Sequence, residues 1–473
     1  LVDEKLLTKL RRFLSFTAIG YQYSPSYQNG WDGTTYLMTK GGKFDLGLLE
    51  KVKSFLFTNN CEYIIQDNRI PKIINKSIDI SVALKKNNLI PREHQIRIRD
   101  LADTYDRGII RAATGAGKSL CCALLAAKIN KPTIIYVIGL DLLDQFYNLF
   151  SKLFDEKIGY IGNGVCEPAR ITIASIWTIG RALNLDKDHI MDDETSISEK
   201  ELDTSNYSKI IDLLKQTKLH IYDECHVVVT STIATIYKNI DPEYIYGFSG
   251  TPFQNIETSI LTNSILGEQI INVSASELID KKILAKPIIK FITVPKMHVS
   301  SSQYLSVYKE YIVENEARND LIVQSVRTLL DKKYTPLVLF KQIKHGNILL
   351  EKLTNAGIKC AMLYGNDSLD KRNEIKAQLV NKEIQVILAS TIFDLGLDLP
   401  ELSGLVLGGG GKSYIRALQR IGRVIRMTPN KKYAAVIDFI DQVKFLKKHS
   451  KIRHQVYCSE QGFEVIVPKG IKW

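Results

Sequence analysis

Short runs of apolar residues recur along most of the chain, separated by longer stretches in which apolar positions have helical spacing. In the first half these runs are four to six residues long and lie at 133–138, 171–174, 219–222 and 244–248. Uninterrupted apolar runs are typical of strands buried on both faces, and their alternation with helices is typical of a parallel sheet. The pattern therefore predicts an α/β fold in which helices cover both faces of the sheet.

The second half of the chain repeats this pattern with a separate set of apolar runs. They lie at 337–340, 360–364, 386–389, 405–407 and 435–439. A length of 473 residues also favours roughly three domains of about 150 residues each. We expect a small α+β N-terminal domain, two sheet domains and a basic C-terminal extension, at 1–85, 86–286, 287–445 and 446–473.

The N-terminal part differs from the rest because aromatic residues and turn signals crowd its middle. The apolar spacing predicts a helix over Leu6–Phe16, a strand over Thr34–Met38 and a second helix over Phe44–Phe57. Several aromatic residues, including Trp31, lie among basic side chains at 21–36. These aromatic rings form either the core of a small domain or stacking platforms for nucleic-acid bases, and both interpretations stay open.

The strongest chemical signal is the stretch Ala112–Ser119, with the sequence AATGAGKS. A short strand at 108–111 precedes it, and an apolar, alanine-rich helix at 120–129 follows. A glycine-containing turn between strand and helix surrounds an anion with backbone N–H groups, and the helix N-terminus adds its positive end. Lys118 would then reach the outer phosphates of a nucleotide, and Ser119 would offer its hydroxyl to Mg²⁺.

Two further strands end in polar side chains that suit nucleotide hydrolysis. One is followed by Asp223 and Glu224, and the other by Ser249 and Thr251. A carboxylate at the end of a strand beside the phosphate-loop strand binds Mg²⁺, and the next carboxylate orients and deprotonates the attacking water. The two hydroxyls at the other strand would couple the nucleotide state to a moving neighbour.

Charge and cysteine usage narrow the partners and the compartment. The formal net charge of +12 favours a polyanionic partner, most simply nucleic acid. No run of about 18 apolar residues occurs, so we expect no membrane span, and the first residues do not resemble a signal peptide. Seven cysteines without CxxC spacing argue against a zinc site or a disulfide framework and favour a reducing interior.

Three local features have simple structural interpretations. Cys121 and Cys122 are expected to pack as small apolar residues in the helix after the phosphate loop. The polar, acidic stretch 184–206 is expected to be a surface loop or a disordered insertion. The basic stretch Lys444–Arg453 is expected to stay solvated rather than to contact DNA.

The order of the motifs in the first half resembles the first motor domain of superfamily 2 helicases. The matching residues are Gln95 ahead of the phosphate loop, the loop itself, Asp223–His226 and Ser249–Pro252. In such proteins the glutamine reads the adenine edge through its amide. The resemblance also implies a second motor domain that carries an arginine-bearing motif, so the second half of the chain tests it.

The second half supplies the implied motif. Residues 389–398 resemble the fifth motif of the family, and residues 419–426, with the sequence QRIGRVIR, resemble the sixth. On a helix, Gln419, Arg423 and Arg426 share one face. From a second domain, the two arginines would reach the γ-phosphate across a cleft as arginine fingers.

The resemblance implies two tandem RecA-like domains that bind ATP and Mg²⁺. The residues implied to be catalytic are Lys118, Asp223, Glu224, Arg423 and Arg426, and the implied Mg²⁺ ligands are Ser119 and Asp223. Those implied to bind the nucleotide are Gln95, Thr114, Gly115, Ala116, Gly117, Lys118, Ser119, Gly396, Asp398 and Gln419. Those implied to contact nucleic acid or to couple its binding to hydrolysis are His226, Ser249, Thr251, Ser390, Thr391 and Trp31.

Further segments, at 16–33 and 340–346 and in the Asp223–His226 box, resemble the UvsW-type recombination helicases of T-even phages. That resemblance implies an ATP-dependent DNA helicase or translocase for forks, Holliday junctions and D-loops in phage recombination, replication and repair. It also implies a place in the cytoplasm of an infected bacterium, with a T-five-type phage as one source. The chain departs from the family at Gly139 and Leu140, where relatives often carry Pro-Thr, so neither residue is assigned a DNA contact.

Other functions stay open at this point. An RNA helicase, or an unwinder of RNA–DNA hybrids, uses the same motor, and so does a double-strand translocase that separates no strands. A nucleic-acid-binding module with an inactive motor belongs to a different class. The intact Lys118, Glu224, Arg423 and Arg426 argue against it. The sequence indicates no protein partner.

Overall fold

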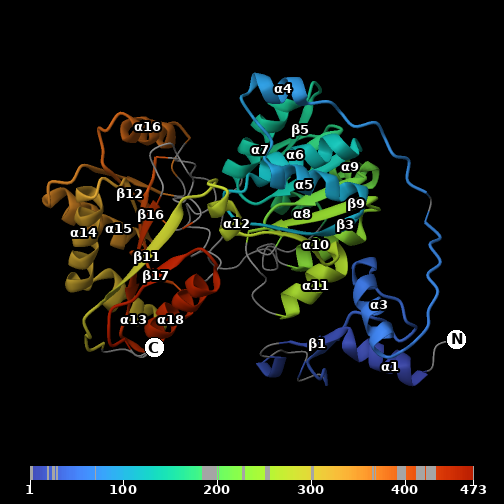
Figure 1. Ribbon diagram of the computed structural model, residues 1–473, viewed down its shortest axis with the longest axis horizontal. Coiled ribbons are helices and arrows are strands. Elements are labelled where there is room, and N and C mark those ends of the chain that lie inside the picture. The colour runs from blue at the N-terminus through green and yellow to red at the C-terminus, as the bar shows by residue number, and fades with distance from the viewer. Residues whose placement is uncertain are drawn as a thin grey trace. The chain divides into compact units, whose positions relative to one another are not determined.

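The computed structural model of the chain describes residues 4–18, 21–23, 27, 30–69, 71–183, 200, 202–225, 230–250, 256–299, 303–364, 367, 369–390, 401–411, 421 and 433–471. The chain forms two compact units, and each contains one large sheet with helices around it (Figure 1). The first unit comprises Leu1–Ala112 with Gly117–Asn272. The second comprises Ala113–Ala116 with Val273–Trp473.

The sheet of the first unit has eight strands in the order β10-β3-β9-β8-β4-β7-β5-β6. The strands from β3 to β5 in this order run parallel, and β6 pairs antiparallel with β5. All residues of β4, β7 and β8 are buried, which matches the uninterrupted apolar runs of the sequence. The bounds are β3 (Arg107–Ala112), β4 (Thr133–Val137), β5 (Ile158–Gly162), β6 (Val165–Glu167), β7 (Ile171–Ser175), β8 (Leu219–Tyr222), β9 (Tyr244–Ser249) and β10 (Gln269–Val273).

The helices of this unit include one that is buried along almost its whole length. Cys121 and Cys122 in α6 are fully buried, which confirms that they pack as small apolar residues. Burial raises the pKa of Cys121 to about 12, so this thiol stays protonated. The bounds are α4 (Ser81–Lys86), α5 (Glu93–Asp100), α6 (Lys118–Ile129), α7 (Leu140–Leu153), α8 (Ile176–Ala182), α9 (Tyr207–Gln216), α10 (Thr230–Lys238) and α11 (Ile256–Leu266), with short 3-10 turns η3 (Leu101–Asp103) and η5 (Thr204–Asn206).

The N-terminal part forms a small α+β arrangement of its own. A two-stranded antiparallel sheet pairs Ser15 with Tyr36, so the predicted helix over Leu6–Phe16 ends earlier, at Phe13. Pairing with the second strand outweighs the local helical spacing there. The bounds are α1 (Glu4–Phe13), β1 (Ser15–Thr17), η1 (Tyr21–Tyr23), β2 (Thr34–Tyr36), η2 (Leu46–Leu48) and α3 (Leu49–Thr58).

The apolar core of this small arrangement includes a residue from outside the N-terminal part. Ile260 of α11 completes the same apolar cluster, whose other buried members are Leu10, Leu14, Met38, Leu48 and Val52. A Cβ added at Gly47 would collide with the backbone carbonyl oxygens of Asn263 and Ser264. The N-terminal part is therefore packed tightly against α11 of the same unit.

An extended segment connects α3 to α4, and it contacts the end of α6. Asn75 Nδ2 donates to the carbonyl oxygen of Asn130 at 2.6 Å, and Ser77 Oγ donates to that of Lys128 at 3.1 Å. The backbone N–H of Ile78 donates to the carbonyl oxygen of Ala127 at 2.8 Å. These hydrogen bonds attach residues 75–78 to the helix that begins at the phosphate loop.

The sheet of the second unit has seven strands in the order β13-β14-β12-β15-β16-β11-β17, and all neighbouring strands run parallel. The central strands β12, β14 and β15 are buried along their whole length. The bounds are β11 (Lys286–Thr293), β12 (Pro336–Phe340), β13 (Cys360–Leu363), β14 (Val386–Ser390), β15 (Gly404–Val406), β16 (Tyr433–Ile440) and β17 (Glu464–Ile466).

Helices flank this sheet as they do in the first unit. Figure 1 shows α14 and α15 beside β12, and α18 beside β17. The bounds are α12 (Ala275–Asp280), α13 (Tyr304–Tyr308), the π-helical turn η6 (Lys309–Val313), α14 (Glu316–Asp331), α15 (Ile343–Asn355), α16 (Leu369–Val380) and α18 (Lys444–Ser459). The predicted fold class, two parallel sheets flanked by helices after a small α+β part, is confirmed.

One expectation about the C-terminal region is wrong. The basic stretch Lys444–Arg453 lies in α18, but Arg453 is only 2% exposed and forms an ion pair with Asp438 at 2.8 Å. A helix that packs on the sheet buries one of its faces, so only part of the basic stretch is solvated.

Most of the acidic stretch, residues 184–199 and 201, lies outside the described residues. Within the described part of the chain, no helix has the length and apolar character needed to cross a membrane.

Candidate active site

The phosphate loop joins β3 to α6, as the sequence predicts. Gly115 and Gly117 have φ angles of 91° and 78°, and α6 begins at Lys118 directly after them. The N–H of Ala116 donates to the carbonyl oxygen of Ala113 at 3.0 Å, which closes the turn. The loop therefore ends at the N-terminus of a 12-residue helix, where unpaired backbone N–H groups and the helix dipole favour an anion.

Gln95 holds the last residue of this loop. Its side-chain oxygen accepts the backbone N–H of Arg92 at 2.9 Å, and its Nε2 donates to the carbonyl oxygen of Gly117 at 3.5 Å. A Cβ at position 117 would lie 2.5 Å from that Nε2. The left-handed φ favours glycine at 117, and a side chain there would also displace the Gln95 amide from the Gly117 carbonyl oxygen. Gln95 thus connects the start of α5 to the loop.

Three charged side chains meet beside the loop, one from the start of α6 and two from the end of β8. The expectation that the carboxylate strand lies beside the phosphate-loop strand is wrong, because β9 lies between β3 and β8. Lys118 Nζ forms an ion pair and hydrogen bond with Glu224 Oε1, and it lies 3.9 Å from Asp223 Oδ1. Asp223 is 4% exposed and Glu224 8%. The geometry therefore brings together the phosphate-loop lysine and both predicted carboxylates.

Burial and mutual attraction act in opposite directions on these groups. Burial opposes the charge of Lys118, but the carboxylates of Glu224 and Asp223 outweigh it, so its pKa is raised. Burial also raises the pKa of Asp223 to about 6, with Lys118 lowering it and Glu224 adding to the rise. The lysine is therefore a fixed cation, while Asp223 is ionised only above mildly acidic pH.

Strand pairing fixes the backbone on both sides of Glu224. The N–H of Asp223 donates to the carbonyl oxygen of Tyr136 at 2.9 Å, and that of Cys225 donates to Phe248 at 2.9 Å. Between them, Glu224 itself has a φ of 49°, a left-handed conformation that is unfavourable for a residue with a side chain. Backbone strain of this kind concentrates at functional sites.

The residues present fit a magnesium ion. Asp223 Oδ1 is buried and accepts no hydrogen bond from the described residues. A buried carboxylate oxygen without a donor suits a hard divalent cation or the water bound to it. Ser119 follows the lysine in the first turn of α6. Ser119 is therefore on the helix that begins at the phosphate loop, and Asp223, which follows β8, has its Oδ1 3.9 Å from Lys118 Nζ of the same helix.

A cavity of about 930 Å³ opens beside the phosphate loop. Gly117 and Ser119 line it on one side, and Arg92 and Gln95 on another. Its volume is within the range of small-molecule sites. The sequence did not single out the polar lining from α7, which is Gln145, Asn148 and Lys152, because exposed polar positions of an amphipathic helix look alike with or without a ligand.

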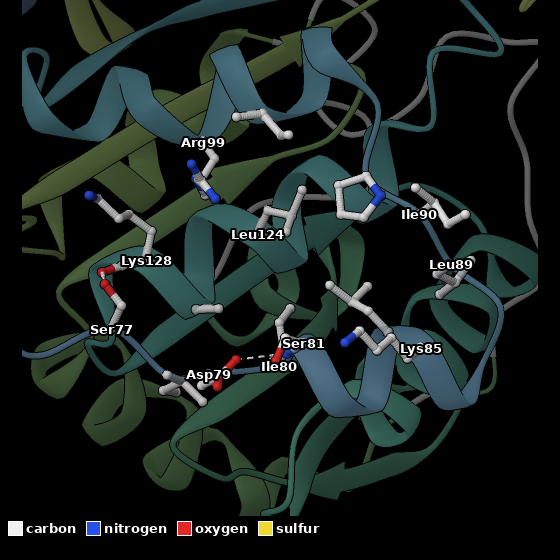
Figure 2. A pocket seen from close by; sticks show the side chains of 15 residues that line it. Ser77, Asp79, Ile80, Ser81, Lys85, Leu89, Ile90, Arg99, Leu124 and Lys128 are labelled. Carbon is white, nitrogen blue, oxygen red and sulfur yellow. Dashed lines mark hydrogen bonds between the residues drawn. The ribbon is translucent and has the colours of Figure 1, made fainter.

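A second cavity of about 640 Å³ shares the wall formed by Leu89, Ile90 and Pro91 with the first. Figure 2 shows its apolar lining surrounded by basic side chains from three helices, Lys85, Arg99 and Lys128. Neither Gly117 nor Ser119 lines it. Of these two cavities, the one beside the phosphate loop is therefore the better candidate for a nucleotide, although Lys118, Asp223 and Glu224 are not among its lining residues.

The other predicted site residues divide into described and undescribed positions. Ser249 and Ser390 are buried at the carboxyl ends of β9 and β14, where ligands of parallel sheets usually bind. Trp31 is half-buried, and its Nε1 donates to the carbonyl oxygen of Thr34 at 3.0 Å. The positions that lie outside the described residues are His226, Thr251, Thr391, Gly396, Asp398, Gln419, Arg423 and Arg426.

Three protein families match successive parts of the chain. Residues 1–67 match the N-terminal part of DNA helicase UvsW, and residues 75–254 match the family described as type III restriction enzyme, res subunit. Residues 320–428 match the helicase conserved C-terminal domain. The second and third matches contain the phosphate loop and the arginine motif, so they correspond to the two motor domains.

Individual relatives agree with this division. The chain is 24% identical to the ATP-dependent DNA helicase UvsW of enterobacteria phage T4, over 98% of this chain and 93% of that protein. It is 22% identical to the probable helicase D10 of Escherichia phage T5, over 74% of this chain and 70% of that protein. A solved structure of Saccharomyces cerevisiae Dbp5 bound to RNA and ADP BeF3 shares the fold, with a TM-score of 0.56 and 12% identity over 82% of this chain and 93% of that chain.

Proposed function

We propose that this chain, an ATP-hydrolysing superfamily 2 helicase related to UvsW, moves along DNA and remodels branched DNA such as forks, Holliday junctions and D-loops. The observation that carries the proposal is the UvsW-type N-terminal part at 1–67. Motor motifs are shared by helicases that act on RNA, whereas this part precedes the motor in a DNA helicase. Phage recombination, replication and repair would be the setting, and the cytoplasm of the infected host the place.

Hydrolysis would begin with an exchange of partners at Lys118. The phosphates of ATP would compete with Glu224 for the lysine, because both are anions that attract the same ammonium. Once Lys118 turns to the phosphates, Glu224 is released to orient the attacking water and accept its proton. Ser119 and Asp223 would hold Mg²⁺, which neutralises phosphate charge when bound. Gln95 is proposed to meet the base, for which its amide would exchange its bonds to Arg92 and Gly117 for bonds to the adenine edge.

The second motor domain would complete the reaction. Arg423 and Arg426 are proposed as the arginine fingers that stabilise charge on the γ-phosphate, with Gln419, Gly396 and Asp398 beside the nucleotide. Binding and release of ATP would then alternate the grip of the two domains on one strand. Ser390 and Thr391 are proposed as phosphate contacts, and such contacts carry little sequence information. His226, Ser249 and Thr251 are proposed to couple the two events.

Basic side chains of α1 and the exposed ring of Tyr36 in β2 are proposed to dock DNA. The guanidinium carbon of Arg11 lies 3.7 Å from the centroid of the Tyr36 ring, and Arg11 Nε donates to the carbonyl oxygen of Met38 at 3.1 Å. Lys9 and Arg12 are exposed on the same helix. Cationic side chains beside an aromatic ring suit a phosphate backbone and an unpaired base, as at the branch point of a fork.

The experiment is ATP hydrolysis by the full chain with a panel of nucleic acids of equal length. We expect forked DNA and Holliday junctions to stimulate turnover more than linear duplex DNA does. Duplex RNA should stimulate little. Equal stimulation by RNA and by branched DNA would refute the proposed substrate and favour the RNA helicase interpretation.

Point variants test the docking face better than a deletion, because removal of the N-terminal part would expose Ile260 of α11. Lys9→Ala with Arg12→Ala should raise the junction concentration needed for half-stimulation about tenfold and reduce its salt dependence. The matched control is Lys53→Ala on α3, whose ammonium is paired with Glu50 at 2.6 Å. If the control and the double variant behave alike, the docking face lies elsewhere.

A further inference from the structure

A run of four glycines, Gly408–Gly411, follows β15 in the second unit. Side chains from three helices bind the carbonyl oxygens of this run. Arg318 Nη1 donates to Gly408 at 2.5 Å, Tyr308 Oη to Gly409 at 2.7 Å, and Arg453 Nη1 to Gly411 at 2.8 Å. Glycine has more backbone freedom than any other residue, so these bonds hold in place a segment that is intrinsically mobile.

The opposite side of the run is held as well. The N–H of Gly409 donates to the carbonyl oxygen of Leu339 at 2.8 Å, and a Cβ at 409 would lie 2.8 Å from the backbone nitrogen of Lys341. The run therefore lies directly against the end of β12. Only glycine fits this approach.

Each arginine that binds the run is itself anchored to a carboxylate at the end of β16. Arg453 makes a two-point bond with Asp438, with both distances 2.8 Å. Arg318 Nε donates to Asp441 Oδ1 at 3.0 Å. The two arginines and the two carboxylates are at most 2% exposed, so two buried chains run from carboxylate to arginine to glycine carbonyl.

A contribution to stability does not explain why these two buried series of carboxylate, arginine and glycine carbonyl are present. Replacing a buried ion pair with apolar residues is often neutral or stabilising, because desolvation of two charges offsets most of their attraction. An apolar pair would fill the same space in the core. Apolar side chains could not donate to the carbonyl oxygens of the glycine run, whereas each arginine donates to one of them. What the two hydrogen-bonded series have in common is therefore that both end on the glycine run.

We propose that Arg318, Arg453 and Tyr308 are positioning residues for the arginine motif at 419–426. The motif begins only eight residues after Gly411, and the three side chains hold the glycine run from which the sequence leads to it. The proposal rests on the proposed role of Arg423 and Arg426. Small errors in the position of a catalytic group cost large factors in rate. Loss of a side chain that holds the glycine run should therefore lower turnover.

The test uses two tyrosine variants of the full chain that differ in one respect. Tyr308→Phe removes the bond to the Gly409 carbonyl oxygen. Tyr457→Phe removes a bond of 3.0 Å to Asp438 Oδ2 in the same buried network and leaves all three glycine bonds intact. Both changes delete one hydroxyl from a fully buried ring, so they should lower the unfolding midpoint by similar amounts.

We expect kcat for ATP to fall about tenfold in Tyr308→Phe and to stay within twofold of wild type in Tyr457→Phe. KM for ATP and the affinity for a fluorescent ATP analogue should be unchanged in both, since the phosphate loop is intact. Arg453→Lys, which keeps the charge, should retain more kcat than Arg453→Met does. Equal kcat in the two tyrosine variants would overturn the proposal, and so would a loss of ATP affinity that parallels the loss of kcat.

The nucleic acid that stimulates wild type best is used for every variant. The ranking of nucleic acids by the wild type tests the proposed function, whereas the ratio of variant to wild type tests the positioning role. Failure of one is therefore distinguishable from failure of the other.

Discussion

Each unit of the molecule buries a cluster of opposite charges, and the two clusters are satisfied to different degrees. In the first unit, Lys118 pairs with Glu224, while Asp223 Oδ1 accepts no hydrogen bond from the described residues. In the second unit, both oxygens of Asp438 accept two hydrogen bonds. Their donors are Arg453 Nη2 and the Phe439 N–H on Oδ1, and Arg453 Nε and Tyr457 Oη on Oδ2.

This difference distinguishes a cluster that can still bind a ligand from a cluster that only holds parts of the protein together. Native structures pair nearly all buried polar atoms, so an unpaired carboxylate oxygen indicates a missing ligand or a functional strain. A saturated carboxylate has no capacity left for a ligand. By this criterion the cluster at Lys118 is poised for exchange, and the cluster at Asp438 is a fixed part of the fold.

The pKa shifts follow the same division. Burial raises the pKa of Asp223 to about 6, since its neighbours compensate desolvation only in part. Burial also opposes the charge of Arg453, but Asp438 outweighs it, and the pKa of Arg453 is raised. In both clusters the carboxylates therefore outweigh the burial of the cation, and it is Asp223 of the first cluster whose burial is compensated only in part.

The largest expected effect comes from removing the cation of the first cluster. Lys118→Ala should lower ATP turnover by about 10³-fold or more, roughly 4 kcal/mol of transition-state stabilisation. The variant should also lose stability, because Asp223 and Glu224 stay buried without their counter-charge, so turnover is measured at a temperature at which the variant is folded. The control is Lys131→Ala, which removes a buried lysine paired with Glu243 at 3.0 Å and should leave turnover unchanged. A Lys118→Ala protein that hydrolyses ATP normally would remove the loop from catalysis.

Glu224→Gln should have the next largest effect. The amide keeps the size of the side chain but cannot accept a proton from water, so turnover should fall about 10²- to 10³-fold. Binding of a fluorescent ATP analogue should persist, because Lys118 loses a competitor for the phosphates. Binding titrations beside single-turnover hydrolysis separate the two effects. Near-normal hydrolysis would assign the base to another residue.

Breaking the saturated cluster should instead cost stability. Asp438→Asn leaves Arg453 buried without its counter-charge, and we expect a loss of about 3 kcal/mol in the free energy of unfolding of the second unit. Urea unfolding followed by intrinsic fluorescence measures it. Lys447→Ala, on the exposed face of the same helix, is the matched control and should change stability by less than about 0.5 kcal/mol. A stable Asp438→Asn protein would contradict the contrast between the clusters.

The sequence predicts the first cluster well and the second not at all. The first cluster can be recognised from the loop Ala112–Ser119 and from the carboxylate pair at a strand end, because ligand chemistry constrains residue types at short spacing. Asp438 and Arg453 pair across 15 residues, from the end of β16 to the middle of α18. Their partnership depends on how the helix packs, which no local pattern encodes.

The same reasoning explains the misplaced elements. Alternating apolar runs predicted the strands of both sheets because burial on two faces leaves a strong compositional mark. The helix expected over Leu6–Phe16 ends early because its last residues pair with β2, a contact set by the fold. The basic stretch in α18 looked solvated because Arg453 resembles its exposed neighbours until the sheet is present. Tertiary contacts therefore decide where local patterns are ambiguous.

The smallest expected effect concerns a buried histidine in the second unit. Burial and the nearby Arg318 lower the pKa of His345 to about 3, so the folded protein keeps it neutral while the unfolded chain protonates it near its ordinary pKa of about 6.5. Below that value the unfolded state binds more protons. The free energy of unfolding should therefore fall as pH decreases, by about 1 kcal/mol between pH 7.5 and 5.5.

His345→Gln should remove that part of the pH dependence, although it lowers stability at both pH values because the bond between His345 Nε2 and Asn319 Oδ1 is altered. The control is His298→Gln at an exposed position, which should keep the wild-type dependence. Urea midpoints at the two pH values measure the difference. A His345→Gln protein with the full wild-type dependence would show that the acid sensitivity comes from other groups.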